Sequence, residues 1–106
     1  MADAYLYSNN CSFVRHCLEE GLQGKLKFLS GFITCNACDH IRRLFDCWLK
    51  YLPTSYTKIL GVPCKVSDTT AKYFTKELLM FRREMEESLG VEITEEGVRH
   101  AVEVYN

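Results

Sequence analysis

Cysteine is the residue type in this sequence with the most chemistry available to it. All six cysteines lie in the first 64 of the 106 residues: Cys11, Cys17, Cys35, Cys38, Cys47 and Cys64. A cysteine thiolate can act as a nucleophile, as a redox group, or as a ligand for zinc and iron–sulfur clusters. Six cysteines in a secreted peptide would indicate a disulfide framework. The first residues lack the basic and apolar regions of a secretory signal, so we expect a soluble, cytoplasmic protein with reduced thiols.

Cys11 and Cys38 occupy the positions where a thiolate is favoured. Each is predicted to open a helix, and Cys38 also follows directly on a predicted strand. The free N–H groups and positive potential of a helix N-terminus stabilise the thiolate over the thiol. In open α/β sheets, this edge of the sheet is also where ligands bind. Cys17 and Cys47 fall inside helices beside apolar positions, which is typical of packing thiols.

Cys35 and Cys38 form a C-x-x-C pair that has several interpretations. A zinc ribbon needs a second pair, and His40 and His100 do not supply one. A thioredoxin-like redox pair suits a strand followed by C-x-x-C and a helix. However, the strand order and the terminal helices do not resemble that fold. An iron–sulfur cluster held by thiolates from separate loops is the third interpretation, and a Cys35 that only ends a strand is the fourth.

The hydrophobic periodicity predicts the elements that position these cysteines. They are a helix from residue 10 or 11 to about residue 21, a strand over 28–34, a helix ended by Pro53, a strand over 56–62, a helix over 67–90 and a helix from 94 onward. A strand, a helix and a second strand form a parallel crossover unit. The sequence therefore predicts an α/β fold, a partial doubly wound parallel sheet followed by two C-terminal helices. Two strands are too few for a complete sheet, so we expect further chain or a partner to complete it.

Caps and apolar stripes refine these elements. Asn10 or Ser12 is expected to cap the first helix, and Ser67 and Thr94 the last two. The predicted inward-facing stripes are Phe13, Val14, Cys17 and Leu18; Ile41, Leu44, Phe45 and Trp48; Ala71, Phe74, Leu78, Phe81 and Met85; and Val98, Ala101, Val102 and Tyr105.

Charge and hydropathy argue against two function classes. Thirteen basic against fourteen acidic residues give a net charge of −1, which argues against nucleic-acid binding. No apolar run approaches the roughly 20 residues of a membrane helix, so no membrane contact is expected. Charge also divides the chain. Residues 1–64 carry seven Lys/Arg and five Asp/Glu, whereas residues 65–106 carry six and nine.

Several blocks of the sequence resemble the 2-hydroxyacyl-CoA dehydratase/benzoyl-CoA reductase family. The matching blocks are residues 10–15 (Asn-Cys-Ser-Phe-Val-Arg), residues 38–45 (Cys-Asp-His-Ile-Arg-Arg-Leu-Phe) with Trp48, Val62-Pro63, Tyr73-Phe74, residues 89–96 and Tyr105-Asn106. They cover nearly all of this chain but only an internal part of a family subunit. The cysteine-containing blocks carry most of the specificity.

The resemblance implies a [4Fe–4S] cluster held by three cysteines between two α/β domains. It also implies a second dehydratase or reductase subunit, an ATP-dependent iron–sulfur activator protein and an acyl-CoA substrate. Dehydratase members eliminate water from a 2-hydroxyacyl-CoA through a ketyl radical, and reductase members reduce an aromatic acyl-CoA. Carried onto this sequence, Cys11 and Cys38 take the positions of two cluster ligands. The third ligand has no counterpart in this chain, and Cys35 is additional to the family pattern, either incidental or a substitute ligand.

The leading hypothesis is therefore a fragment of an iron–sulfur subunit, inactive alone. Residues 1–66 would form a partial α/β cluster-binding region, and residues 67–106 a helical segment leading toward a second domain. Two alternatives remain open. One is a thiol–disulfide redox protein that uses Cys35 and Cys38, and the other is a non-catalytic assembly module whose cysteines only pack.

Overall fold

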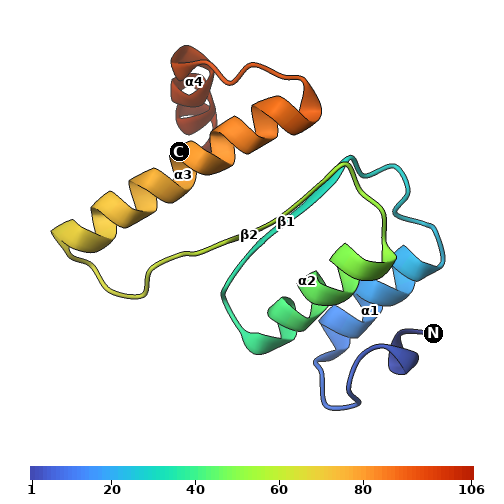
Figure 1. Ribbon diagram of the computed structural model, residues 1–106. Helices are drawn as coiled ribbons and strands as arrows, with labels where there is room; N and C mark the ends of the chain where they lie inside the picture. Colours follow the sequence, from blue (N-terminus) through green and yellow to red (C-terminus); the bar gives the residue numbers. More distant parts are fainter.

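A parallel pair of strands joined by a crossover helix forms the centre of the structure (Figure 1). The structure is a computed structural model that describes residues 1–106. Its elements are the 3-10 helix η1 (Ala2–Ala4), α1 (Ser12–Leu22), β1 (Gly31–Cys35), α2 (Asp39–Tyr51), β2 (Tyr56–Leu60), α3 (Asp68–Leu89) and α4 (Glu95–Tyr105). The predicted α/β fold, with two parallel strands alternating with helices before two C-terminal helices, is confirmed.

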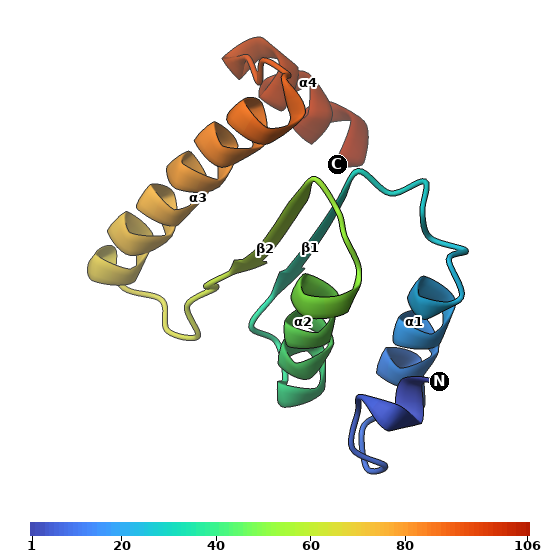
Figure 2. The same cartoon turned by 45° about the vertical axis from the view of Figure 1, so that its right-hand side comes forward.

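The register of the sheet sets where each element begins and ends. Gly31 pairs with Tyr56 and Cys35 pairs with Leu60. A Cβ at Gly31 would lie 2.9 Å from the Tyr56 carbonyl oxygen, so the close approach of the strands requires glycine there. Because the strands are parallel, both end at one edge of the sheet, and α1 and α2 both begin at that edge (Figure 2).

The buried core lies between η1, α1, α2 and the sheet. The buried residues are Ala2, Leu6, Val14, Leu18, Leu44, Trp48 and Tyr56. The Trp48 ring stacks on Phe32 of β1 at a centroid separation of 4.3 Å, which joins α2 to the sheet. Four members of the predicted stripes on α1 and α2 are thus core residues, but Phe13 is 66% exposed because it lies on the outer side of α1.

The element boundaries confirm some predicted caps and correct others. Ser67 and Thr70 form a capping box at the start of α3, and Thr94 accepts a hydrogen bond from the Gly97 N–H group at the start of α4. The helix α1 starts where predicted, but its predicted cap was wrong, because the N-cap is Cys11 and the Asn10 side chain donates to the Tyr7 carbonyl oxygen. The first strand begins at residue 31 rather than 28, and Phe28 is 76% exposed ahead of it.

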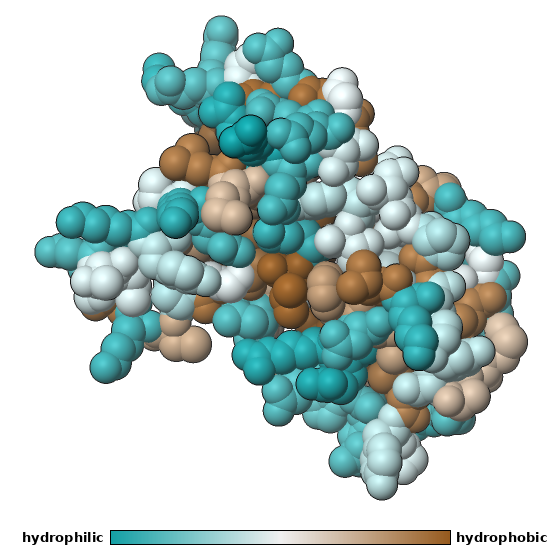
Figure 3. Space-filling model, viewed as in Figure 1, coloured by the Kyte–Doolittle hydropathy of each residue, from teal (hydrophilic) through white to brown (hydrophobic).

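The helices α3 and α4 contain no buried residue. The prediction that α4 turns an apolar face inward was wrong, since Val98, Val102 and Tyr105 are all exposed. The Cα radius of gyration is 15.9 Å, whereas a compact domain of this length has about 13 Å. Figure 3 shows patches of apolar surface among the polar residues of these two helices. Among the helices and strands, α3 contacts β2. None of the helices combines the length and apolar character needed to cross a bilayer.

Candidate functional site

Cys11 and Cys38 are the N-cap residues of the adjacent helices α1 and α2. Both have extended backbone angles, with ψ near 150° at Cys11 and 167° at Cys38, and both thiols are free and exposed. Neither side chain accepts a hydrogen bond from its own helix. The structure therefore places two unpaired thiols, beside first-turn amides that no cap side chain satisfies, at the carboxyl edge of the strands.

A histidine connects these two helix starts. His40 lies in the first turn of α2, and its Nδ1 atom accepts a hydrogen bond from the Cys11 N–H group at 3.2 Å. The same Nδ1 atom lies 3.0 Å from Asn10 Oδ1. His40 is half-buried, so it is not the surface residue that a helix-start histidine usually is.

Asn36 shapes the loop between the two cysteines of the C-x-x-C pair. Its N–H group donates to the Leu60 carbonyl oxygen at 3.2 Å, and its side-chain Oδ1 accepts from the Val62 N–H group at 2.9 Å. These bonds tie the loop that follows β1 to the chain leaving β2. Cys35 ends β1, is half-buried, and forms no disulfide with Cys38.

The remaining cysteines divide into two groups. Cys17 and Cys47 are partly buried and pack against the core, as predicted. Burial raises the pKa of the Cys17 thiol, with the Cys11 thiolate adding to the effect, and burial together with Asp46 raises the pKa of the Cys47 thiol. Both are therefore poor thiolates. Cys64 is exposed in the loop between β2 and α3.

Donors at this edge are too few for a complete metal site. Within residues 1–106, no group of three or more His, Cys, Asp or Glu side chains lies close enough together to hold a metal ion. Arg42 forms an exposed ion pair with Asp39 at 3.5 Å, and Arg43 forms one with Asp46 at 3.1 Å. The edge thus offers thiols and backbone amides, and any cluster bound there needs additional ligands.

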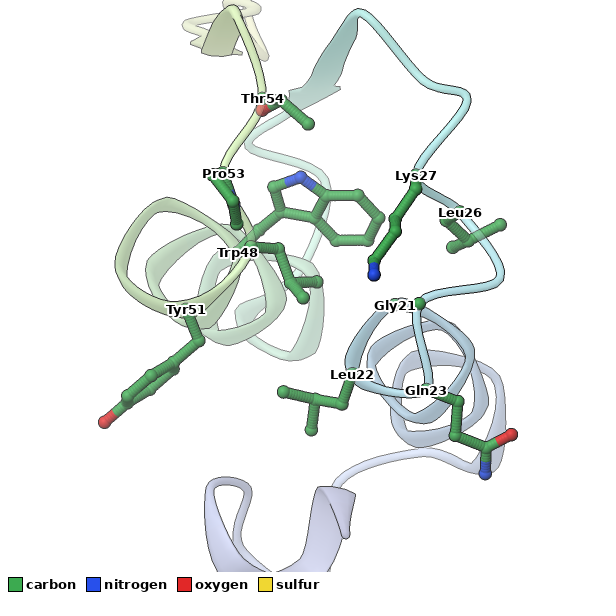
Figure 4. Close-up of a pocket in the computed structure, with 11 residues that line it drawn as sticks. Gly21, Leu22, Gln23, Leu26, Lys27, Trp48, Tyr51, Pro53 and Thr54 are labelled. Carbon is green, nitrogen blue, oxygen red and sulfur yellow. The ribbon is translucent and has the colours of Figure 1, made fainter.

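A cleft lies at the opposite ends of α1 and α2. This cleft of about 240 Å³ is lined by residues that include Leu22, Lys27, Trp48 and Leu52. Figure 4 shows Lys27 pointing toward Trp48 across the cleft, whereas Tyr51 and Gln23 point away from it. The Trp48 Nε1 atom is buried and has no hydrogen-bond partner. Because the cleft is formed by the C-terminal turns of both helices, it is separate from the cysteine edge.

Sequence reasoning placed the two N-cap cysteines and His40 at this edge, but it did not predict the hydrogen bonds of His40 and Asn36 there. Asn10 was assigned to a helix cap, and Asn36 received no role. A polar residue in the loop between a strand and a helix does not by itself indicate which backbone group it will bond to. No local spacing predicts the bond from Cys11 to His40, because the two residues are 29 positions apart and lie at the starts of different helices.

The fold and the cysteine positions define a class of protein: a parallel α/β unit that presents thiols at the carboxyl edge of its strands. Comparison with known families makes this specific. The family described as "2-hydroxyglutaryl-CoA dehydratase, D-component" matches residues 1–106, so the chain belongs to that family. The resemblance that the sequence blocks indicated is confirmed.

Two relatives show how the chain relates to complete subunits. It is 32% identical over 105 residues to a benzoyl-CoA reductase subunit from Thauera aromatica, a match that covers 98% of this chain and 27% of the relative. It is 27% identical over 110 residues to the (R)-phenyllactyl-CoA dehydratase beta subunit of Clostridium sporogenes, covering 99% of this chain and 28% of the relative. The chain therefore spans about a quarter of the length of these relatives, both of which are enzyme subunits.

Proposed function

We propose that this chain is the part of an acyl-CoA dehydratase or reductase subunit that holds one side of a [4Fe–4S] cluster. The observation that carries the proposal is the placement of Cys11 and Cys38 as exposed N-caps of adjacent helices at one edge of the sheet. Family membership supplies the chemical context, because the relatives act on CoA thioesters by name. When bound, such a cluster supplies single electrons at low potential to the thioester.

The residues present fit part of a cluster site. Thiolates are the usual ligands of iron–sulfur clusters, and Cys11 and Cys38 are free thiols that no disulfide occupies. Unsatisfied first-turn amides are suited to donate hydrogen bonds to sulfur, which tunes the reduction potential of such clusters. Cys11 and Cys38 would hold the cluster, and the third ligand would come from outside this chain, with Cys35 as the alternative.

The division of the chain follows from this assignment. Residues 1–66 would form the cluster-binding part, and residues 67–106 would lead toward the second domain. The expected partners are a second subunit of the enzyme, an ATP-dependent iron–sulfur activator and the acyl-CoA substrate. Both relatives are named as subunits, which supports an assembly of this kind.

Metal analysis of the chain tests the proposal. The chain is purified without oxygen, reconstituted with iron and sulfide in the presence of a small thiol, and assayed for iron, sulfide and zinc. We expect near-equal iron and sulfide, and a fall to less than about a tenth of that content in Cys11→Ser and Cys38→Ser. Cys47→Ala is the matched control, because its sulfur packs in the core and is expected to leave the content unchanged.

Three results would contradict the proposal. Zinc bound by Cys35 and Cys38 without sulfide would indicate a mononuclear thiolate site instead. Iron and sulfide retained in both serine variants would show that other residues hold the cluster. A reversible disulfide between Cys35 and Cys38 in a metal-free chain that takes up no iron would favour the redox alternative.

A further inference from the structure

His40 makes a direct hydrogen bond between the two cysteine-bearing segments. Its Nδ1 atom accepts the Cys11 N–H group at 3.2 Å, although the two residues are 29 positions apart in the sequence. His40 also lies two residues after Cys38, within the first turn of α2. The imidazole of His40 is therefore hydrogen-bonded to the backbone of Cys11 and lies two residues from Cys38 in the sequence.

We propose that His40 is a positioning residue that fixes the Cys11 thiol relative to the Cys38 thiol. This inference rests on the proposed function and deepens it, because it identifies what arranges the two cluster ligands. His40 itself is not assigned as a ligand. It acts through the backbone of Cys11, whose N–H group donates to its Nδ1 atom.

The packing of the helices alone does not fix the Cys11 thiol. Contacts among Val14, Leu18, Leu44 and Trp48 hold α1 against α2, but Cys11 precedes the first helical residue and has extended backbone angles. Its amide N–H group donates no hydrogen bond within the helix, because the first N–H groups of a helix have no intrahelical acceptor. The hydrogen bonds that Asn10 donates are local, since both its backbone and its side chain donate to the Tyr7 carbonyl oxygen.

A cluster needs its thiolates at a set separation, and residues that hold the ligands in place affect retention of the metal. Loss of such a supporting group typically weakens metal binding about 10- to 100-fold. In this structure the supporting contact is the hydrogen bond that the His40 Nδ1 atom accepts from the Cys11 N–H group. Asparagine at position 40 can place its Oδ1 close to where His40 has Nδ1, whereas alanine removes the acceptor.

The experiment compares His40→Ala with His40→Asn and with a matched control. The control is His16→Ala, because His16 is an exposed histidine on α1 with no hydrogen bond to the cysteine edge. Two quantities are measured on the whole 106-residue chain. They are the hydrogen–deuterium exchange rate of the Cys11 amide in the metal-free protein, and the rate at which reconstituted protein loses iron to a chelator.

We expect His40→Ala to speed exchange of the Cys11 amide and to speed iron loss about tenfold. His40→Asn is expected to restore both toward the parent values, and His16→Ala to change neither. Amide exchange elsewhere in α2 serves as the folding check. Rescue by asparagine separates a lost acceptor from a general disturbance of the helix.

The two measurements distinguish failure of this inference from failure of the proposed function. An unchanged Cys11 amide in His40→Ala would overturn the positioning role, whether or not iron binds. Equal rates of iron loss in the parent and in His40→Ala would show that His40 does not affect retention of the cluster, which would also overturn the positioning role. If the parent chain takes up no iron and sulfide, the proposed function fails, while the amide exchange still decides whether His40 holds Cys11.

Discussion

Different kinds of contact stabilise the two parts of this molecule. Residues 1–60 contain every fully buried side chain, and their helices pack on the sheet through apolar contacts. The helices α3 and α4 bury none, and polar side chains of β2 bond to α3. The cysteine edge belongs to the first part, where α1 and α2 pack on the apolar core.

The attachment of α3 illustrates the second kind of contact. Glu84 accepts hydrogen bonds from the Tyr56 hydroxyl at 2.8 Å and from Lys58 Nζ at 3.1 Å. Burial, and then the hydrogen bond to Glu84, raise the pKa of Tyr56. Hydrogen bonds from Lys58 first and Tyr56 second lower the pKa of Glu84. The Tyr56–Phe81 ring contact, with centroids 6.3 Å apart, adds an apolar element.

The largest predicted difference between the two parts comes from truncating an apolar side chain in each. Trp48 is 2% exposed and stacks on Phe32, so we expect Trp48→Ala to lower the free energy of unfolding by about 3–5 kcal/mol. Leu79 of α3 is 59% exposed, and Leu79→Ala should change it by less than about 0.5 kcal/mol. Urea denaturation followed by circular dichroism measures both. Similar losses in the two variants would show that α3 is buried in solution.

A smaller effect is expected from cutting the polar attachment of α3. Tyr56→Phe removes the hydroxyl that donates to Glu84 but keeps the ring in the core, so we expect a loss of about 1.5 kcal/mol. Amide exchange in α3 should speed up, while exchange in α2 stays unchanged. Tyr7→Phe is the control, because the Tyr7 ring is 79% exposed. Equal exchange changes in α2 and α3 would mean that the two parts unfold as one unit.

The smallest effect is expected from acid acting on the first part. The Ala2 N–H group first, then the amino terminus and Gln23, lower the pKa of Glu19 from its ordinary 4.5 to about 2. Because the folded-state pKa is the lower one, this stabilisation is complete above pH 4.5 and is lost as the pH falls toward 2.

Nuclear magnetic resonance of the Ala2 amide against pH measures the titration. The amide should shift with an apparent pKa of about 2, and Glu19→Gln should abolish the shift. An apparent pKa near 4.5 would show that η1 is detached from α1 in solution.

Sequence patterns predicted the first part of the fold better than the second, and the reason is physical. Periodicity identifies an apolar face but not what covers it. On α2, the apolar residues Leu44 and Trp48 are buried in the core beside the sheet. The equally regular stripe with Leu78 on α3 is largely exposed, because only one side of α3 reaches β2.

The candidate site shows the same limit. Helix-start rules located Cys11 and Cys38, because an N-cap follows from local sequence. They could not show that His40 bonds to the Cys11 amide, since that contact depends on how two helices pack. Asn10 does not cap α1, because Cys11 takes the N-cap position and the side-chain amide of Asn10 donates to the Tyr7 carbonyl oxygen.

The proposed role of the cysteine edge is to hold a sulfide-bridged iron cluster. Mössbauer spectroscopy of the chain reconstituted with ⁵⁷Fe without oxygen tests this role most directly, because it reports the electronic state of every bound iron. We predict the signature of a diamagnetic [4Fe–4S] cluster in the parent chain and its loss in Cys11→Ser and Cys38→Ser. Isolated high-spin ferrous iron in the parent chain, or the same cluster signature in both variants, would contradict it.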